Sequence, residues 1–391
     1  MTRRRRVLVY AQHLSGVGHY VRIREIAGAL AQEQRVVLVQ GGRPVPRPDH
    51  GCVFDVVELP PLRRGPQGIE PLDRGRKLEE VLAVRAARLG RAAAELAPDV
   101  LVVEHYPFSK WELAPEIDAL IDAARAANPD VELVCSARDI LRRTGHEHAS
   151  DGVWQRRVIA TLNDRFDALL VHADPSFTRL EEHFAGAGEL AVRVAYTGFV
   201  SEKPGPAVGD ARARAAGLAA GEASVVVSTG GGAGSAALVE RVVEAWRRLV
   251  SRGADAGRRM QVFCGLFWSD DEIQKLRARA AGGRCVVLPF TSDFLHHVEN
   301  ADLSISRAGY NTCTNLLEAR CRSLLLPDPH MSDQLFRAQR FAEHGLAEVV
   351  SGEEPSVAEL AEAIEAALRR ERPRHAFDLD GAQRTCDLLS R

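Results

Sequence analysis

A histidine and three glycine-containing loops are the residues of this chain whose types and spacing suit chemistry on a phosphate-bearing substrate. His19 follows the apolar run Val7–Tyr10 and the two glycines Gly16 and Gly18. The N-terminus of a helix lowers the pKa of a histidine, so the neutral ring can accept a proton from a hydroxyl group. The pattern therefore predicts that His19 is a general base. Helix capping and simple ligand contact are the alternatives.

A second loop has three consecutive glycines and follows the apolar run Val225–Val227 directly. Glycines allow backbone N–H groups to approach an anion closely, and the N-terminus of a following helix attracts negative charge. A tight turn without a ligand is the alternative. We favour anion binding because a helix is predicted to begin at once at residue 235. The expected phosphate-binding residues are Thr229, Gly230, Gly231, Gly232 and Ser235.

The third loop, residues 306–312, precedes a predicted helix on which Asn311, Asn315 and Glu318 share one face. Such a polar stripe can hydrogen-bond a ribose or a base, although a solvated helix face explains it equally well. Further along, Asp333 and Gln334 open another helix, where an acid and an amide can bind several sugar hydroxyls. Ordinary N-capping is the better explanation of that pair considered alone.

Polar residues also follow two apolar segments of the first half. Glu104 and His105 come after residues 100–103, and Arg138 and Asp139 come shortly after residues 131–135. In a parallel sheet the carboxyl ends of the strands share one edge, so these residues are expected on the same rim as His19. Glu104 and Asp139 are further candidates for the base. Interdomain salt bridges are the alternative for both pairs.

Strand-like and helix-like segments alternate in both halves, which predicts an α/β fold of two tandem Rossmann-like, doubly wound domains facing across a cleft. The expected domains are residues 1–197 and 223–372, with a linker at 198–222. A last helix in 373–391 is expected to pack back on the first domain. The predicted helices are 19–33, 76–97, 113–128, 153–166, 176–184, 235–251, 270–281, 292–299, 310–320, 333–344 and 356–370.

Composition excludes several other classes of protein. The net charge of −2 over 391 residues gives no support to nucleic-acid binding. Seven cysteines without a Cys-x-x-Cys pair indicate reduced core thiols rather than a disulfide or zinc framework. The arginines at 3–6 are followed by too short an apolar run for a signal peptide, and no stretch suits a membrane span. We therefore expect a cytoplasmic protein.

Taken together, the loops resemble those of the GT-B glycosyltransferases, and most of all family 28 and its related bacterial predicted glycosyltransferases. The resemblance spans most of the chain in the expected order. The matching stretches are 16–22, 104–108, 136–140, 196–200, 229–234, 308–312 and 333–338.

This resemblance implies inverting transfer of a sugar from a nucleotide diphosphate sugar, with UDP favoured, to a hydroxyl acceptor. By position, the glycine loop would bind the diphosphate and His19 would act at the acceptor. Asp333 and Gln334 would contact the sugar. Arg307, Gly309, Asn311, Thr312 and Asn315 would line the nucleotide site, and Gly16, Gly18, His105 and Arg138 would lie on the acceptor side. No metal or cofactor is implied, and the acceptor is a small molecule or a lipid-linked one.

Two positions depart from the family pattern. Asn315 stands where the family carries a glutamate that binds ribose hydroxyls, and a neutral group binds a diol less strongly than a carboxylate does. Glu318 would substitute only on a rotated helix. Asp328 stands where related chains carry an arginine. A UDP-GlcNAc 2-epimerase-like enzyme and a non-catalytic nucleotide-sugar-binding protein therefore remain alternatives, and a dinucleotide-dependent oxidoreductase is disfavoured.

Basic residues gather around the predicted helix 76–97. A weak peripheral membrane contact is one interpretation, and a solvated surface is the favoured one because Glu79, Glu80 and Glu95 dilute the charge. The basic residues concerned are Arg63, Arg64, Arg74, Arg76, Lys77, Arg85, Arg88 and Arg91.

Overall fold

The computed structural model describes residues 4–14, 16, 18–45, 53–65, 67–141, 151–203, 224–230, 236–291 and 293–390. These residues form two compact units. The first contains the described residues of 4–201 together with 377–390, and the second contains those of 202–376. From residue 204 onward, the expected linker lies outside the described residues.

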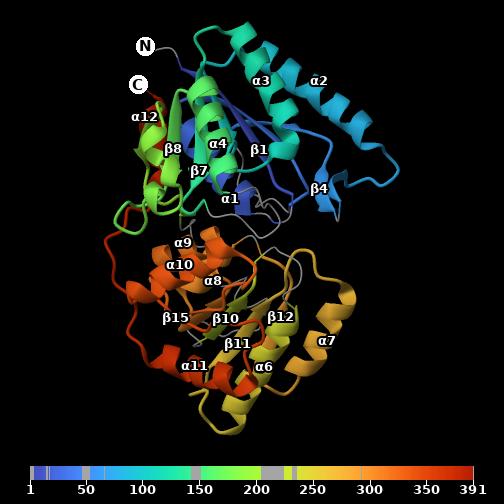
Figure 1. The fold of residues 1–391 in the computed structure, drawn as a ribbon. Helices are drawn as coiled ribbons and strands as arrows, with labels where there is room; N and C mark the ends of the chain where they lie inside the picture. The colour runs from blue at the N-terminus through green and yellow to red at the C-terminus, as the bar shows by residue number, and fades with distance from the viewer. Residues whose placement is uncertain are drawn as a thin grey trace. The chain divides into compact units, whose positions relative to one another are not determined.

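The first unit is built on a seven-stranded, wholly parallel sheet (Figure 1). Its strand order is β3-β2-β1-β6-β7-β8-β9. The central strands are continuously apolar because helices cover both of their faces. The strands are β1 (Arg6–Gln12), β2 (Arg35–Gly41), β3 (Asp55–Glu58), β6 (Val100–Glu104), β7 (Glu132–Arg138), β8 (Ala168–His172) and β9 (Arg193–Tyr196).

The helices of this unit follow the predicted ones closely, with one exception. Residues 176–184 form only turns and the short 3-10 segment η2 (Leu180–Glu182), so the helix predicted there is wrong. The Asp174 carboxylate accepts from the backbone N–H of Ser176 at 2.8 Å, and the Tyr196 hydroxyl accepts from that of Leu180 at 2.7 Å. These bonds compete with a helix. The helices are α1 (Gly18–Ala31), α2 (Leu78–Leu96), α3 (Ala114–Ala127), α4 (Asp151–Arg165), α12 (Gly381–Leu389), and the 3-10 segments η1 (Trp111–Leu113) and η3 (Ala185–Glu189).

An antiparallel hairpin, β4 (Leu62–Gly65) and β5 (Gly68–Pro71), is an addition to the predicted elements. Sequence patterning gave no sign of it because β4 contains a single apolar residue. The backbone N–H of Arg64 donates to the carbonyl of Leu14 at 3.2 Å, which ties the hairpin to the loop that precedes His19. Beside the hairpin, an open hollow of about 370 Å³ is lined by Leu59, Val81 and three prolines together with charged residues such as Asp73 and Arg88.

The C-terminal helix α12 belongs to the first unit, although the described residues of 202–376, which form the second unit, precede it in sequence. It packs against α1, and Cys386 and Leu389 enter the core cluster of the first sheet (Figure 1). A Cβ atom at Gly381 would lie 2.6 Å from the carbonyl oxygen of Gly198. Only glycine therefore permits this close approach of the two backbones.

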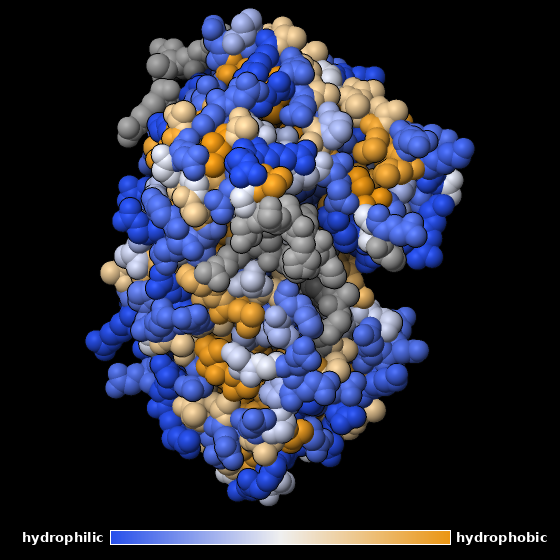
Figure 2. Space-filling model, viewed as in Figure 1, coloured by the Kyte–Doolittle hydropathy of each residue, from blue (hydrophilic) through white to orange (hydrophobic). Residues whose placement is uncertain are grey.

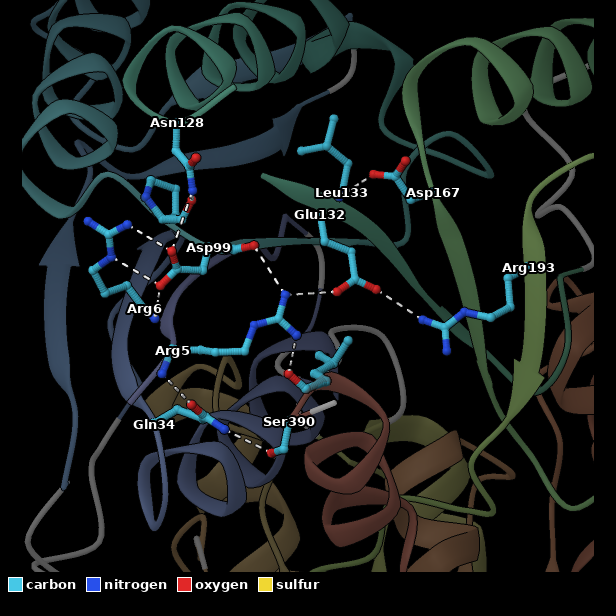
Figure 3. A network of polar contacts seen from close by, with 12 residues as sticks. Arg5, Arg6, Gln34, Asp99, Asn128, Glu132, Leu133, Asp167, Arg193 and Ser390 are labelled. Carbon is cyan, nitrogen blue, oxygen red and sulfur yellow. Dashed lines mark hydrogen bonds and ion pairs between the residues drawn. The ribbon is translucent and has the colours of Figure 1, made fainter. Parts of the chain in front are cut away.

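A network of polar contacts joins the amino ends of the strands of the first sheet (Figure 3). The Arg6 guanidinium donates to both oxygens of Asp99, at 3.1 and 2.8 Å. Arg5 pairs with Glu132 at 3.1 Å and donates to the carbonyl of Leu389 at 2.7 Å, which holds the end of α12 in place. This edge lies opposite the carboxyl ends, so the network is structural.

The second unit contains a six-stranded parallel sheet in the order β12-β11-β10-β13-β14-β15. Its strands are β10 (Ser224–Ser228), β11 (Arg259–Phe263), β12 (Cys285–Leu288), β13 (Leu303–Ser306), β14 (Ser323–Leu325) and β15 (Glu348–Val349). Its helices are α6 (Ala236–Ser251), α7 (Asp270–Ala280), α8 (Phe294–Glu299), α9 (Tyr310–Ala319), α10 (Ser332–Glu343) and α11 (Val357–Arg369).

Counted within each unit and with the hairpin set aside, the second sheet has the doubly wound order 3-2-1-4-5-6, and the first has the same order with a seventh strand, β9, added beside the sixth. The predicted fold class, two Rossmann-like α/β domains in tandem, is confirmed. None of the described helices is long and apolar enough to span a bilayer.

Candidate active site

The strand order of each sheet reverses at its first strand, and this directs attention to two pairs of loops. In the first unit β1 lies between β2 and β6, and in the second β10 lies between β11 and β13. Ligands of doubly wound sheets bind beyond the carboxyl ends of the strands at these reversal points. The relevant residues are those that follow β1 and β6, and those that follow β10 and β13.

In the first unit this rule brings His19 and Glu104 together, 85 residues apart in sequence. The Nδ1 atom of His19 lies 2.5 Å from Oε1 of Glu104. The His19 side chain is 24% exposed, whereas the Glu104 carboxylate is fully buried. Burial lowers the pKa of His19 to about 4, and this outweighs the opposing effect of the Glu104 charge. The ring is therefore neutral at pH 7, with Nδ1–H donating to Glu104 and the Nε2 lone pair available as a base.

Two cations, Arg22 and Lys110, hold Glu104 in its ionised form. Arg22 donates to Oε1, and the Lys110 ammonium contacts Oε2 and donates to the Glu104 carbonyl at 2.9 Å. Burial alone would raise the pKa of this carboxyl, but the interaction with the His19 ring and the charges of Lys110 and Arg22 hold it well below its ordinary value. A buried carboxylate needs such compensation, because an unpaired buried charge is strongly destabilising.

Sequence reasoning missed Arg22 and Lys110 as members of this site. Arg22 stands three residues after His19, on the same face of α1, and this spacing was an available signal. Lys110 follows Glu104 by six residues but reaches it only because residues 105–110 turn back on themselves. That return depends on the positive φ angles of His105 (61°) and Lys110 (67°), which local sequence does not indicate.

The other residues expected on this rim lie at the same edge. The His105 ring centroid lies 5.5 Å from that of His19, and its Nδ1 atom is buried without a hydrogen-bond partner. Burial, then the charge of Arg138, lower the pKa of His105 well below its ordinary value. Asp139 is buried and accepts from the backbone N–H of Ile140 at 2.8 Å. Gly16 and Gly18 flank the start of α1.

A buried chain of hydrogen bonds lies beneath this rim. The His172 ring bridges the hydroxyls of Ser136, at 2.7 Å from Nε2, and Thr197, at 2.8 Å from Nδ1. Burial lowers the pKa of His172 well below its ordinary value. Because the ring has no exposed surface, it positions the ends of β7 and β8 rather than contacting a substrate.

We expect the first unit to lose stability as the pH falls below about 6.5. His19, His105 and His172 all have lowered pKa values in the folded chain. The unfolded chain therefore binds more protons as the pH falls through 6.5, and the free energy of unfolding declines. Denaturant midpoints measured between pH 7.5 and 5 test this. The decline should be shallower in His172→Gln, and a midpoint independent of pH would contradict the argument.

In the second unit the structure describes only the beginning of the glycine loop. Thr229 and Gly230 follow β10, and Gly230 has a φ of 76° that favours glycine. The backbone N–H of Gly230 donates to the Ser228 hydroxyl at 3.3 Å. The expected phosphate-binding residues Gly231, Gly232 and Ser235 lie outside the described residues.

Two arginines tie together the loops that follow β13 and β14. Arg307 donates to the carbonyl of Leu326 at 2.9 Å. Arg337, which sequence reasoning did not select, is buried in α10 and donates to the carbonyl of Ala308 at 2.6 Å. It also lies 3.5 Å from the carboxylate of Asp333. Arg337 therefore fixes the turn into α9 and the expected sugar-binding carboxylate at the same time.

The sugar-binding pair expected at the start of α10 is buried. The N-cap residue is Met331, whose side chain makes no capping bond, so N-capping does not account for Asp333 and Gln334. The Gln334 side-chain oxygen accepts from the backbone N–H of Asp328 at 3.1 Å. This bond shapes the loop after β14.

On α9 the structure places Asn311 and Thr312 in the first turn and Asn315 in the second, after the N-cap Gly309. Asn315 is only 3% exposed, and its amide donates to the Glu202 carboxylate at 2.7 Å. Glu318 instead pairs with Lys203 at 3.1 Å. Among the described residues, no group of three or more His, Cys, Asp or Glu side chains is arranged to hold a metal ion.

The basic cluster expected around α2 is partly internal. Arg85 is fully buried, and its guanidinium donates to both oxygens of Glu116 at 2.7 Å, so its assignment to a surface is wrong. Arg63 and Arg64 form ion pairs with Glu70 and Glu112. Where α2 and the hairpin lie, the face drawn in Figure 2 has hydrophobic residues directly beside hydrophilic ones.

Comparison with known proteins supports the family resemblance. Residues 225–377 match the model of the glycosyltransferase family 28 C-terminal domain. The UDP-N-acetylglucosamine–N-acetylmuramyl-(pentapeptide) pyrophosphoryl-undecaprenol N-acetylglucosamine transferase of Pseudomonas fluorescens is 33% identical over 144 residues. This match covers 36% of the chain and 39% of the relative. The chain thus spans less than half the length of that curated relative.

Solved structures match over nearly the whole chain. The spinosyn forosaminyltransferase SpnP has a TM-score of 0.61 at 13% identity, covering 99% of this chain and 94% of that one. Acinetobacter baumannii MurG has a TM-score of 0.52 at 16% identity, covering 98% and 95%. At these identities the likeness shows the fold, which is GT-B. The chain therefore has a GT-B fold, and its residues 225–377 are similar to the C-terminal domain of the family 28 glycosyltransferases.

Proposed function

We propose that this chain is an inverting glycosyltransferase, with the base in the first unit and the nucleotide-sugar donor bound by the second. The observation that carries the proposal is the His19–Glu104 pair at the reversal point of the first sheet. A neutral imidazole held through Nδ1 by a buried carboxylate is suited to remove a proton from an acceptor hydroxyl.

In this mechanism the Nε2 atom of His19 takes the acceptor proton while the acceptor oxygen attacks the anomeric carbon of the sugar. The new C–O bond forms on the face opposite the bond to the diphosphate, which breaks and leaves with its electron pair. This single displacement inverts the configuration. Glu104 stabilises the imidazolium that forms, and Arg22 and Lys110 keep Glu104 ionised and in place.

The departing diphosphate gains negative charge, which the second unit is built to stabilise. Backbone N–H groups at the start of α9 supply donors, and Arg307, which precedes this helix, adds a positive charge. This stabilisation requires no metal ion. The match of residues 225–377 to the family and the name of the relative, which gives UDP-N-acetylglucosamine as that protein's donor, support a UDP-sugar as the donor.

The acceptor is a hydroxyl-bearing natural product, sugar or lipid-linked molecule. The hollow beside the hairpin supports an acceptor with an apolar part, because prolines, Leu59 and Val81 dominate its lining. The hairpin that borders it is bonded to the loop before His19. We place this reaction in the cytoplasm, with any membrane contact peripheral.

A thermal-shift screen against UDP, GDP, TDP, ADP and their sugars tests the donor class. We expect UDP and UDP-sugars to raise the melting temperature by roughly 5–10 °C at a hundred times their Kd, with little effect of the others. Incubation with the donor alone, and then with an acceptor panel, separates the activities. An epimer formed without acceptor would indicate an epimerase. Binding without transfer or hydrolysis would indicate a nucleotide-sugar-binding protein.

A further inference from the structure

The contact between Asn315 and Glu202 joins two residues that lie 113 positions apart. The Nδ2 group of Asn315 donates to Oε2 of Glu202 at 2.7 Å. The Oδ1 atom of the same amide is buried and accepts no hydrogen bond. An orphaned acceptor on a side chain that is 97% buried is costly unless a ligand supplies a donor.

The carboxylate of Glu202 lies where burial disfavours its charged form. Burial raises the pKa of this carboxyl, and the Asn315 amide counteracts part of that effect. The neighbouring Lys203 pairs with Glu318 on α9, so this segment is fastened to the helix at two successive residues. A carboxylate held in this way serves recognition better than packing, because an apolar residue would fill the same space at lower cost.

The position of the pair links it to the donor site. Asn315 lies four residues after Asn311 on α9, and α9 follows β13, the strand beside β10 at the reversal point of the second sheet. A nucleotide whose diphosphate binds at the start of α9 places its sugar within reach of the next turn of this helix.

Resting on the function proposed above, we infer that Glu202 and Asn315 form one hydroxyl-binding pair for the ribose diol of the donor nucleotide. A diol presents two O–H donors, and the pair offers the carboxylate of Glu202 and the orphaned Oδ1 of Asn315 as acceptors. The Asn315 amide meanwhile orients the carboxylate. The negative charge is thus supplied from residue 202 instead of from position 315.

Binding of UDP and of 2′,3′-dideoxy-UDP, measured by calorimetry, tests this assignment. The wild-type chain should bind UDP more tightly than the dideoxy compound, which lacks both hydroxyls. Glu202→Gln should weaken UDP binding about tenfold or more, the effect of losing a charge-assisted hydrogen bond, and should leave dideoxy-UDP binding unchanged. Glu299→Gln, which neutralises a carboxylate on the neighbouring helix α8, is the matched control and should alter neither affinity.

A second pair of variants exchanges the position of the charge. Asn315→Glu alone sets two carboxylates side by side, so it should weaken UDP binding by like-charge repulsion. The same substitution combined with Glu202→Gln restores one carboxylate and one amide, and should recover most of the lost affinity. This recovery distinguishes a recognition role from a structural one.

Equal loss of UDP and dideoxy-UDP affinity in Glu202→Gln, without recovery in the double variant, would overturn the inference while leaving the proposed function intact. Failure of the wild-type chain to bind any nucleoside diphosphate would instead reject the proposed function, and the inference with it.

Discussion

Replacing His19 by alanine should reduce sugar transfer by about 10²–10⁴-fold, the usual contribution of a positioned general base. Nucleotide binding should be nearly unchanged, because His19 belongs to the first unit and the loops proposed to bind the donor belong to the second. The loss should appear in kcat at saturating donor and acceptor. Initial rates of nucleotide release measure it, and calorimetry with UDP measures the retained binding.

A companion variant tests the role of the buried carboxylate. Glu104→Gln removes the charge that raises the pKa of His19, so the acidic limb of the pH–rate profile should move to lower pH. Turnover should also fall, because the imidazolium formed during reaction loses its counter-ion. His330→Ala changes an exposed histidine of the second unit and should alter neither measurement. Retained turnover in His19→Ala would reassign the base to Asp139 or Glu104.

The elements of this fold could be predicted because their signals are local. Runs such as Val225–Val227 and Val100–Val103 are apolar on both faces, which indicates strands covered by helices on each side. Each is followed at once by glycine or polar residues and then by a helix. The one wrong helix, at 176–184, failed because the hydroxyl of Tyr196, a distant residue, takes a backbone donor that a helix would need.

The candidate site was predictable in its location but not in its pairings. The rule for doubly wound sheets placed His19 and Glu104 at one edge, since each follows an apolar run. Their contact depends on β1 lying directly beside β6, and this strand order is a property of the whole sheet. The contact of Lys110 with the same carboxylate depends further on the positive φ angles of His105 and Lys110.

Charged residues were the hardest to interpret from sequence. Arg85 was assigned to a surface cluster because it stands among basic residues, yet it is buried against Glu116, 31 residues away. Arg5 and Arg6 looked like part of a basic N-terminal run, and they are structural ties to Glu132 and Asp99. The role of a charged residue depends on the residue with which it pairs, and these partners are distant in sequence.

Leu389→Ala should destabilise the first unit by about 2–5 kcal/mol, the usual cost of a cavity in a well-packed core. Leu389 is fully buried in the core cluster of the first sheet, and its carbonyl accepts from Arg5 at 2.7 Å. Because α12 belongs to this unit, the substitution should lower the unfolding transition of the first unit and leave that of the second nearly unchanged.

Urea unfolding monitored by hydrogen exchange resolves the two units and measures this effect. Gln383→Ala, at an exposed position of the same helix, is the matched control and should shift neither transition by more than about 0.5 kcal/mol. If Leu389→Ala changed the stability of the first unit no more than Gln383→Ala does, α12 would not be part of the core of that unit.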